Sequence, residues 1–137
     1  MKWLFDTNVL SELRKGDRCH PGVARWADGI SDESRYTSVL VIGEIRRGIE
    51  RLRRKDVAQA KAIGRWLEQL RRAFPGRLLE VTEEVAEEWG RLDAQDPRPA
   101  IDRLLAATAK VHGLTLVTRN TVDFASMGVE LLNPFEE

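Results

Sequence analysis

Short segments with the composition of strands alternate with longer segments of helical periodicity along the whole chain. The strand-like segments are residues 3–5, 35–38, 78–81, 114–117 and 129–132. Strands that alternate with helices favour a parallel sheet whose two faces are covered by helices. We therefore predict an α/β fold, in which a single-domain parallel β-sheet is flanked by helices on both faces.

Apolar residues at helical spacing predict two long helices in the first half of the chain. We expect Ser38 to cap the first, whose apolar stripe is Ile42, Ile45, Ile49 and Leu52. The second begins after Asp56 and ends at Pro75-Gly76, and its stripe is Ile63, Leu67, Leu70 and Phe74.

Capping residues predict the bounds of the shorter helices. We expect the helix after Asp6 to end at a left-handed Gly16, and Pro21 to begin the next helix. Thr82 is a candidate N-cap, and a helix rich in small residues, which begins at residue 100, should stop at Gly113.

The composition is that of one globular domain. The 137 residues are 42% hydrophobic and 32% charged, which suffices for one core and is too short for two ordinary domains. No run approaches the roughly 18 apolar residues of a membrane helix, and MKWLFDTN has no export signal. Cys19 is the only cysteine, so we expect a cytoplasmic location. His20 and His112 are too few for a zinc site of the usual spacing.

The net charge is zero, but the charges are unevenly distributed along the chain. Basic residues dominate from Arg46 to Arg72, and acidic residues dominate from Glu80 to Asp102. Such asymmetry can steer a polyanion toward one face of a protein, although it is also typical of solvated helix surfaces. We predict phosphate contacts by the arginines of the first helix in this basic region, which are Arg46, Arg47, Arg51, Arg53 and Arg54.

Four acidic residues fall where an α/β protein places functional groups. Asp6 ends the first strand, and Asp123 follows the strand at 114–117 in a polar turn. Glu44 lies about two turns into its helix in an apolar stretch, and Asp102 lies in the first turn of the helix that begins at residue 100. Side chains beyond the carboxyl ends of parallel strands gather at one edge of the sheet, so we expect these acids to meet there.

Clustered carboxylates need a compensating positive charge. Burial and mutual repulsion both raise the pKa values of such groups, and a hard divalent cation such as Mg²⁺ accepts oxygen ligands and keeps several waters. A metal held in this way supports phosphodiester hydrolysis, in which one carboxylate activates the attacking water. Polar side chains beside the outer acids are suited to bind ligands, water or phosphate, and they are Thr7, Asn8, Thr118 and Asn120.

Each acid also has a structural explanation. Asp6 is a possible helix cap, Asp102 a favourable first-turn acid and Asp123 a turn residue. Glu44 would be accounted for by an ion pair with Arg47 or Arg103. Spacing alone does not bring the four acids together.

Several segments resemble one family of nucleases. The segments FDTNVLSELRK, YTSVLVIGEIRRGIERL, AIDRLLAATAKVHGLTLVTRNTVDF and LLNPF resemble the PIN-domain ribonuclease toxins of the VapC/FitB type. The resemblance extends from about residue 1 to 135, and it implies one PIN-like domain over residues 1–137. It implies that Asp6, Glu44, Asp102 and Asp123 form the catalytic and metal-binding cluster, with Mg²⁺ or Mn²⁺ as cofactor.

The resemblance also implies a biological setting. Such proteins cleave RNA, often tRNA or ribosomal RNA, and are inhibited by a cognate DNA-binding antitoxin in a type II toxin–antitoxin pair. A homodimer is expected on the same basis.

Three alternatives remain from the sequence. A phosphatase with an aspartyl nucleophile would carry D-x-D, but residue 8 is Asn8. A receiver domain would carry an early acidic pair and a late lysine, where this chain has Arg119. The third is a non-catalytic PIN-like module that binds RNA or an antitoxin.

Overall fold

The computed structural model describes residues 1–137, and its centre is a five-stranded sheet in which every neighbouring pair of strands is parallel. The strand order is β3-β2-β1-β4-β5, so the first strand lies in the middle. This confirms the predicted parallel sheet. The strands are β1 (Trp3–Phe5), β2 (Arg35–Ser38), β3 (Leu78–Leu79), β4 (Thr115–Val117) and β5 (Leu131–Leu132).

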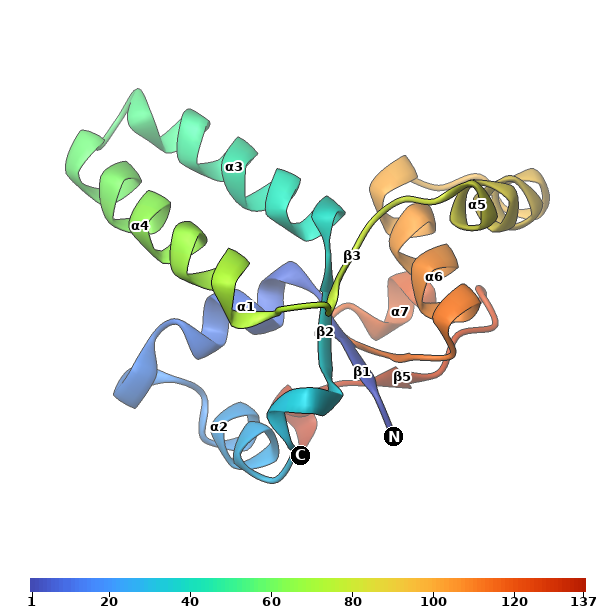
Figure 1. The fold of residues 1–137 in the computed structure, drawn as a ribbon, viewed down its shortest axis with the longest axis horizontal. Coiled ribbons are helices and arrows are strands. Elements are labelled where there is room, and N and C mark those ends of the chain that lie inside the picture. The colour runs from blue at the N-terminus through green and yellow to red at the C-terminus, as the bar shows by residue number, and fades with distance from the viewer.

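Helices cover both faces of this sheet, as the sequence predicts. One long pair, α3 and α4, extends to one side of the strands, and α5 and α6 pack together on the other side (Figure 1). The helices are α1 (Thr7–Leu13), α2 (Pro21–Asp28), α3 (Val39–Arg53), α4 (Val57–Ala73), α5 (Glu83–Gln95), α6 (Ala100–His112) and α7 (Thr121–Phe124). Short 3-10 helices occupy Gly16–Arg18, Asp32–Ser34 and Pro134–Glu136.

The core surrounds the two central strands. Leu4 and Phe5 of β1 and Leu116 and Val117 of β4 are almost completely buried. They pack between the apolar stripes of the helices on the two faces, and full burial of each such side chain stabilises the fold by roughly 1.5–3 kcal/mol. Alanines at positions 106, 107 and 109 are also buried. These small side chains let α6 lie close to the sheet.

Side-chain caps confirm most of the predicted helix starts. The Ser38 hydroxyl accepts a hydrogen bond from the backbone N–H of Leu40 at 3.0 Å, and the Thr82 hydroxyl accepts one from Val85 at 3.2 Å. Gly113 ends α6 with a φ of 65°, a left-handed conformation that costs glycine little. The small-residue helix therefore stops where the sequence predicts.

Some predicted bounds were wrong. α1 ends at Leu13, and the left-handed Gly16 begins a 3-10 turn instead of terminating the helix. The predicted strands at 78–81 and 129–132 shorten to two residues each, because only Leu78–Leu79 and Leu131–Leu132 pair with a neighbouring strand. Asp123 lies in the single-turn helix α7 and not in an irregular turn.

No helix combines the length and the apolar composition that a bilayer crossing requires.

Candidate active site

The carboxyl ends of β1 and β4 lie side by side in the middle of the sheet. The backbone N–H of Asp6 donates to the carbonyl of Val117 at 3.0 Å, which extends the pairing of the two strands by one residue. Asp6 and Thr118, the residues that follow these strands, therefore meet. This is the edge of a parallel sheet at which ligands are usually bound.

Asp6 is both a helix cap and the centre of a polar cluster. One carboxylate oxygen accepts a hydrogen bond from the backbone N–H of Thr7 at 2.7 Å, at the start of α1. The other accepts from the Thr118 hydroxyl at 2.8 Å and from the Asn8 amide at 3.3 Å. Burial nevertheless raises the pKa of Asp6, because desolvation outweighs these three hydrogen bonds. The cap proposed from the sequence is thus real, and it leaves a buried, costly negative charge.

Asn8 and Thr118 connect the two loops that follow β1 and β4. The Asn8 amide donates to the Thr118 hydroxyl at 3.3 Å, and its carbonyl accepts from the backbone N–H of Arg119 at 3.0 Å. Thr118 also accepts from the backbone N–H of Asn120 at 3.1 Å. The network fixes the position of the Asp6 carboxylate.

Glu44 projects from α3 toward the same region and is held by α1. The Thr7 hydroxyl donates to one Glu44 carboxylate oxygen at 2.7 Å. Burial raises the pKa of Glu44 most; the Thr7 hydrogen bond lowers it, and the charges of Asp6 and Asp102 raise it further. The second carboxylate oxygen has no hydrogen-bond partner within the chain.

Neither ion pair suggested for Glu44 is formed. Arg103 lies 2.9 Å from Asp96 instead. Arg47 lowers the pKa of Glu44 through its charge but makes no salt bridge with it. A purely structural explanation of Glu44 by a cationic partner therefore fails.

Asp102 shares the electrostatic field of the other acids. It is half-buried in the first turn of α6. Burial is the main cause of its raised pKa, and the charges of Asp6 and Asp123 raise it further. Asp102 is thus affected by the charges of acids that follow two different strands, β1 and β4.

Asp123 and Asn120 lie at the open side of the cluster. Both side chains are exposed, and Asn120 joins the network only through its backbone N–H. Asp123 is connected to the others through its charge, which acts on Asp102. These two residues are therefore less constrained than Asp6 and Thr118.

The donor set fits a hard divalent cation held partly through water. None of the four acids forms a salt bridge with lysine or arginine. No three of the chain's His, Cys, Asp or Glu side chains converge closely enough to form a complete ligand set. Because Mg²⁺ keeps several waters and needs only one or two direct carboxylates, oxygen donors grouped more loosely still suit it.

The predicted RNA-binding arginines fall into two groups. Arg46 and Arg53 pair with Glu50 on the exposed surface of α3, at 3.6 and 3.0 Å. Arg47, Arg51 and Arg54 form no salt bridge. The second group is free to bind an anion, and Arg47 lies near enough to Glu44 to affect its pKa.

Sequence reasoning missed one polar cluster near the site. Arg103, next to Asp102, is 1% exposed and pairs with Asp96. Asp96 also accepts a hydrogen bond from the Ser126 hydroxyl at 2.9 Å, three residues beyond Asp123. The available signal was an arginine inside the apolar stretch of a helix, which predicts a buried partner.

Comparisons of the sequence place this chain in a family. It matches the PIN domain over residues 3–130. A VapC ribonuclease, Y4jK of Sinorhizobium fredii, is 30% identical over 97% of this chain and 97% of its own length. The toxin FitB of Neisseria gonorrhoeae is 32% identical over 98% of this chain and 99% of its own. The chain belongs to the PIN-domain family and is of the VapC/FitB type.

Solved structures share the whole architecture. The crystal structure of FitAcB from Neisseria gonorrhoeae superposes with a TM-score of 0.87 at 31% identity, and covers 98% of this chain and 99% of that chain. A toxin–antitoxin complex from Klebsiella pneumoniae gives a TM-score of 0.70 at 25% identity over 97% and 98% of the two chains.

Proposed function

We propose that this protein is a Mg²⁺-dependent endoribonuclease that acts as the toxin of a type II toxin–antitoxin pair. The observation that carries the proposal is electrostatic. Burial raises the pKa values of Asp6, Glu44 and Asp102, and the charges of neighbouring acids raise those of Glu44 and Asp102 further. No cation of the chain forms a salt bridge with any of the three. The names of two relatives, VapC ribonuclease and toxin FitB, support the same function.

Asp6, Glu44, Asp102 and Asp123 are the proposed metal ligands, directly or through water. When bound, Mg²⁺, for which Mn²⁺ is a substitute, lowers the pKa of a coordinated water and offsets the charge of the transition state. Both carboxylate oxygens of Asp6 already accept hydrogen bonds, whereas one oxygen of Glu44 is free. We assign to Glu44 the role of orienting and deprotonating the attacking water.

The polar neighbours hold these acids in place. Thr7 fixes Glu44 through its hydroxyl, while Asn8 and Thr118 fix Asp6. Asn120 lies exposed at the rim, where its side chain is available to water or phosphate. A loss of geometry here would reduce the rate even with all four acids present.

RNA is the proposed substrate, with tRNA or ribosomal RNA as the expected targets. Three arginines without an acidic partner follow the helix that carries Glu44: Arg47 and Arg51 lie on α3, and Arg54 caps its C-terminal end. Arginine neutralises phosphates and releases counterions, which supplies much of the non-specific affinity for RNA. Arg46 and Arg53 would first have to leave Glu50, so we expect smaller contributions from them.

The proposed partner is a cognate antitoxin that binds DNA, in a cytoplasmic complex. The Klebsiella pneumoniae structure is a toxin–antitoxin complex, which supports this assignment for a chain of the same fold. A homodimer and a toxin–antitoxin hetero-oligomer remain expectations.

A cleavage assay tests the enzymatic proposal. A labelled RNA should be cut in Mg²⁺ or Mn²⁺, and EDTA should stop the reaction. Asp6→Ala and Asp102→Ala should abolish cleavage while circular dichroism shows a folded protein. A wild-type protein that binds RNA but cuts none under any divalent ion would favour the non-catalytic binding module.

A further inference from the structure

A small cavity opens directly beside the candidate active site. Its volume is about 240 Å³, and Thr7 and Glu44 are among the residues that line it. Ile45 and Ile49 of α3 contribute apolar wall, and Trp66 of α4 lines it as well. The cavity is smaller than the roughly 300–1,000 Å³ typical of sites for drug-sized ligands, so it suits a single planar group.

We propose that this cavity binds one unpaired base of the RNA, adjacent to the phosphate that is cleaved. The inference rests on the proposed function and adds a base-binding residue, Trp66, that the sequence analysis did not identify. Proteins bind single-stranded RNA by stacking bases on aromatic side chains. Trp66 is half-buried, so its ring is fixed by packing and remains partly accessible.

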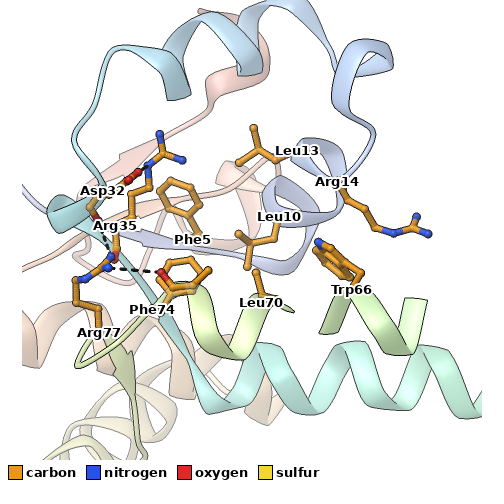
Figure 2. Close-up of a pocket in the computed structure, with 11 residues that line it drawn as sticks. Phe5, Leu10, Leu13, Arg14, Asp32, Arg35, Trp66, Leu70, Phe74 and Arg77 are labelled. Atoms are coloured by element: carbon orange, nitrogen blue, oxygen red, sulfur yellow. Dashed lines mark hydrogen bonds and ion pairs between the residues drawn. The ribbon is translucent and has the colours of Figure 1, made fainter. Parts of the chain in front are cut away.

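Arg14 completes the site on the side of α1. Its guanidinium lies 5.8 Å from the centre of the Trp66 ring, and Figure 2 shows the two side chains next to each other at one end of the neighbouring cavity. The Arg14 side chain is exposed and lines both cavities. A cation in this position can bind the phosphate of a nucleotide whose base stacks on Trp66.

Charge determines which part of a nucleotide can enter. The Glu44 carboxylate lines the cavity, so a phosphate would be repelled there unless a metal bound it. A neutral base avoids this repulsion, and its polar edge can bond to the hydroxyls and the carboxylate of the wall. The base would thus occupy the cavity while the phosphate stays with the acids.

A larger cavity, which Trp66 and Arg14 also line, fits a base less well. It measures about 430 Å³ and is lined by Phe5, Leu10 and Phe74 (Figure 2). None of the four candidate acids contributes to it. An occupant of that cavity would not have to lie beside the reacting phosphate, whereas an occupant of the smaller one would.

Substitution of Trp66 combined with RNA lacking single bases tests the proposal. We would use an oligonucleotide that wild-type protein cuts at one bond, and replace each nucleotide near that bond in turn by an abasic one. The loss of one stacked base should lower kcat/KM by roughly 5- to 150-fold. Trp66→Leu should lower kcat/KM on intact RNA by a similar factor. The kcat/KM of this variant should not fall further when the nucleotide at that one position is abasic.

Matched variants separate stacking from stability. Trp66→Phe keeps an aromatic face. It should therefore retain most of the wild-type activity and most of the loss that wild-type protein shows on the abasic RNA. Trp89→Leu removes another half-buried tryptophan, from α5 on the opposite side of the sheet, and should leave the abasic profile unchanged. Assays well below the Tm of each variant exclude unfolding as the cause.

The proposal is wrong if wild-type and Trp66→Leu proteins lose activity equally at every abasic position. That result, with normal cleavage of intact RNA, would leave the proposed function in place and favour a protein segment as the occupant. If wild-type protein cuts no RNA, the proposed function fails. The cavity is then tested by quenching of the fluorescence that Trp66→Phe removes, using the same oligonucleotides, and equal quenching by abasic and intact RNA would overturn base binding.

Discussion

The helix pair α3–α4 and the helix pair α5–α6 lie on opposite sides of the sheet (Figure 1) and differ in charge. Each pair contributes one candidate acid, Glu44 from α3 and Asp102 from α6. Basic residues exceed acids in α3–α4, whereas acids exceed basic residues in α5. Both helix pairs therefore contribute a carboxylate to the candidate site, but the surfaces they present to a polyanion have opposite charge.

The internal ion pairs enlarge this difference. On α3, Glu50 forms salt bridges with Arg46 and Arg53, and the remaining arginines have no acidic partner. On α5, Arg91 pairs with both Glu87 and Glu88, and other acids remain unpaired. The positive field of α3–α4 favours the approach of a polyanion, and the negative field of α5–α6 opposes it. We infer that RNA approaches over α3, while α6 supplies a ligand group and no backbone contacts.

The largest expected effect tests whether the two sides are equivalent at the site. Glu44→Gln and Asp102→Asn should each lower kcat by at least about 100-fold, since each removes a charge that acts on the metal or the attacking water. Rates of cleavage in Mg²⁺ at fixed ionic strength measure this.

Acids of the same helices outside the site provide the controls. Glu50→Gln on α3 and Glu87→Gln on α5 should change the rate by less than about threefold, because exposed pairs contribute little. If Asp102→Asn behaved like Glu87→Gln, α6 would have no part in the chemistry.

The second prediction concerns the charge difference itself. Arg47→Ala combined with Arg51→Ala should reduce the slope of log K against log salt by about 1.4, since each phosphate contact on a single strand contributes about 0.7. The slope is obtained from the constants for RNA binding to the protein, measured between low and moderate salt under conditions in which the RNA is not cut. Arg91→Ala with Arg98→Ala removes the same charge from the acidic side, and an equal change there would refute the assignment of RNA to α3.

The third prediction concerns the polar cluster of α6, which has no counterpart on α3. Asp96→Ala leaves the buried Arg103 guanidinium without its acidic partner and should lower the Tm by roughly 5 °C or more. Arg103→Met removes the charge as well and should cost less. Thermal unfolding compares the two, and a larger loss in Arg103→Met would show that the packing of the long side chain matters more than its charge.

The smallest effect is expected at Asp6, between the two sides. Its pKa in the folded protein is raised above the ordinary value of 3.8. Between pH 3.8 and the folded pKa, the folded state therefore holds a proton that the unfolded chain has released. Stability from this residue is therefore present at low pH and is lost as pH rises above 3.8 through the folded pKa.

Asp6→Asn isolates this contribution, because it keeps the cap and removes the charge. Without metal, the Tm of the variant should rise relative to that of the wild type as pH is raised from about 4 to 7. Adding Mg²⁺ should close the gap by compensating the carboxylate in the wild type. A Tm difference that does not vary with pH would mean that Asp6 is not desolvated.

Local sequence signals predicted much of the architecture. The stripe from Ile42 to Leu52 gave α3 because helical spacing of apolar residues needs no knowledge of the partner surface. The end of α6 at Gly113 was predictable because only glycine adopts that backbone conformation cheaply. Strands β3 and β5 were predicted too long, because pairing depends on how far a neighbouring strand extends.

The site was predicted as a set of residue types and not as a geometry. Resemblance to a family and position at strand ends named Asp6, Glu44, Asp102 and Asp123, and the residues beside them. The sequence did not reveal that Thr7 of α1 holds Glu44 of α3, or that Trp66 lies beside the same cavity. These contacts join residues far apart in the chain, so no local pattern encodes them.

The amino-acid sequence by itself determined the parallel α/β fold class, the helix caps and which acidic residues are candidates for the site. Periodicity and capping could be recognised because they depend on residues only a few positions apart. Only the tertiary structure decided that Arg103 pairs with Asp96 and leaves Glu44 without a cationic partner. Which charges compensate one another depends on distances in space, and these are set by how α3 and α6 pack around the central strands.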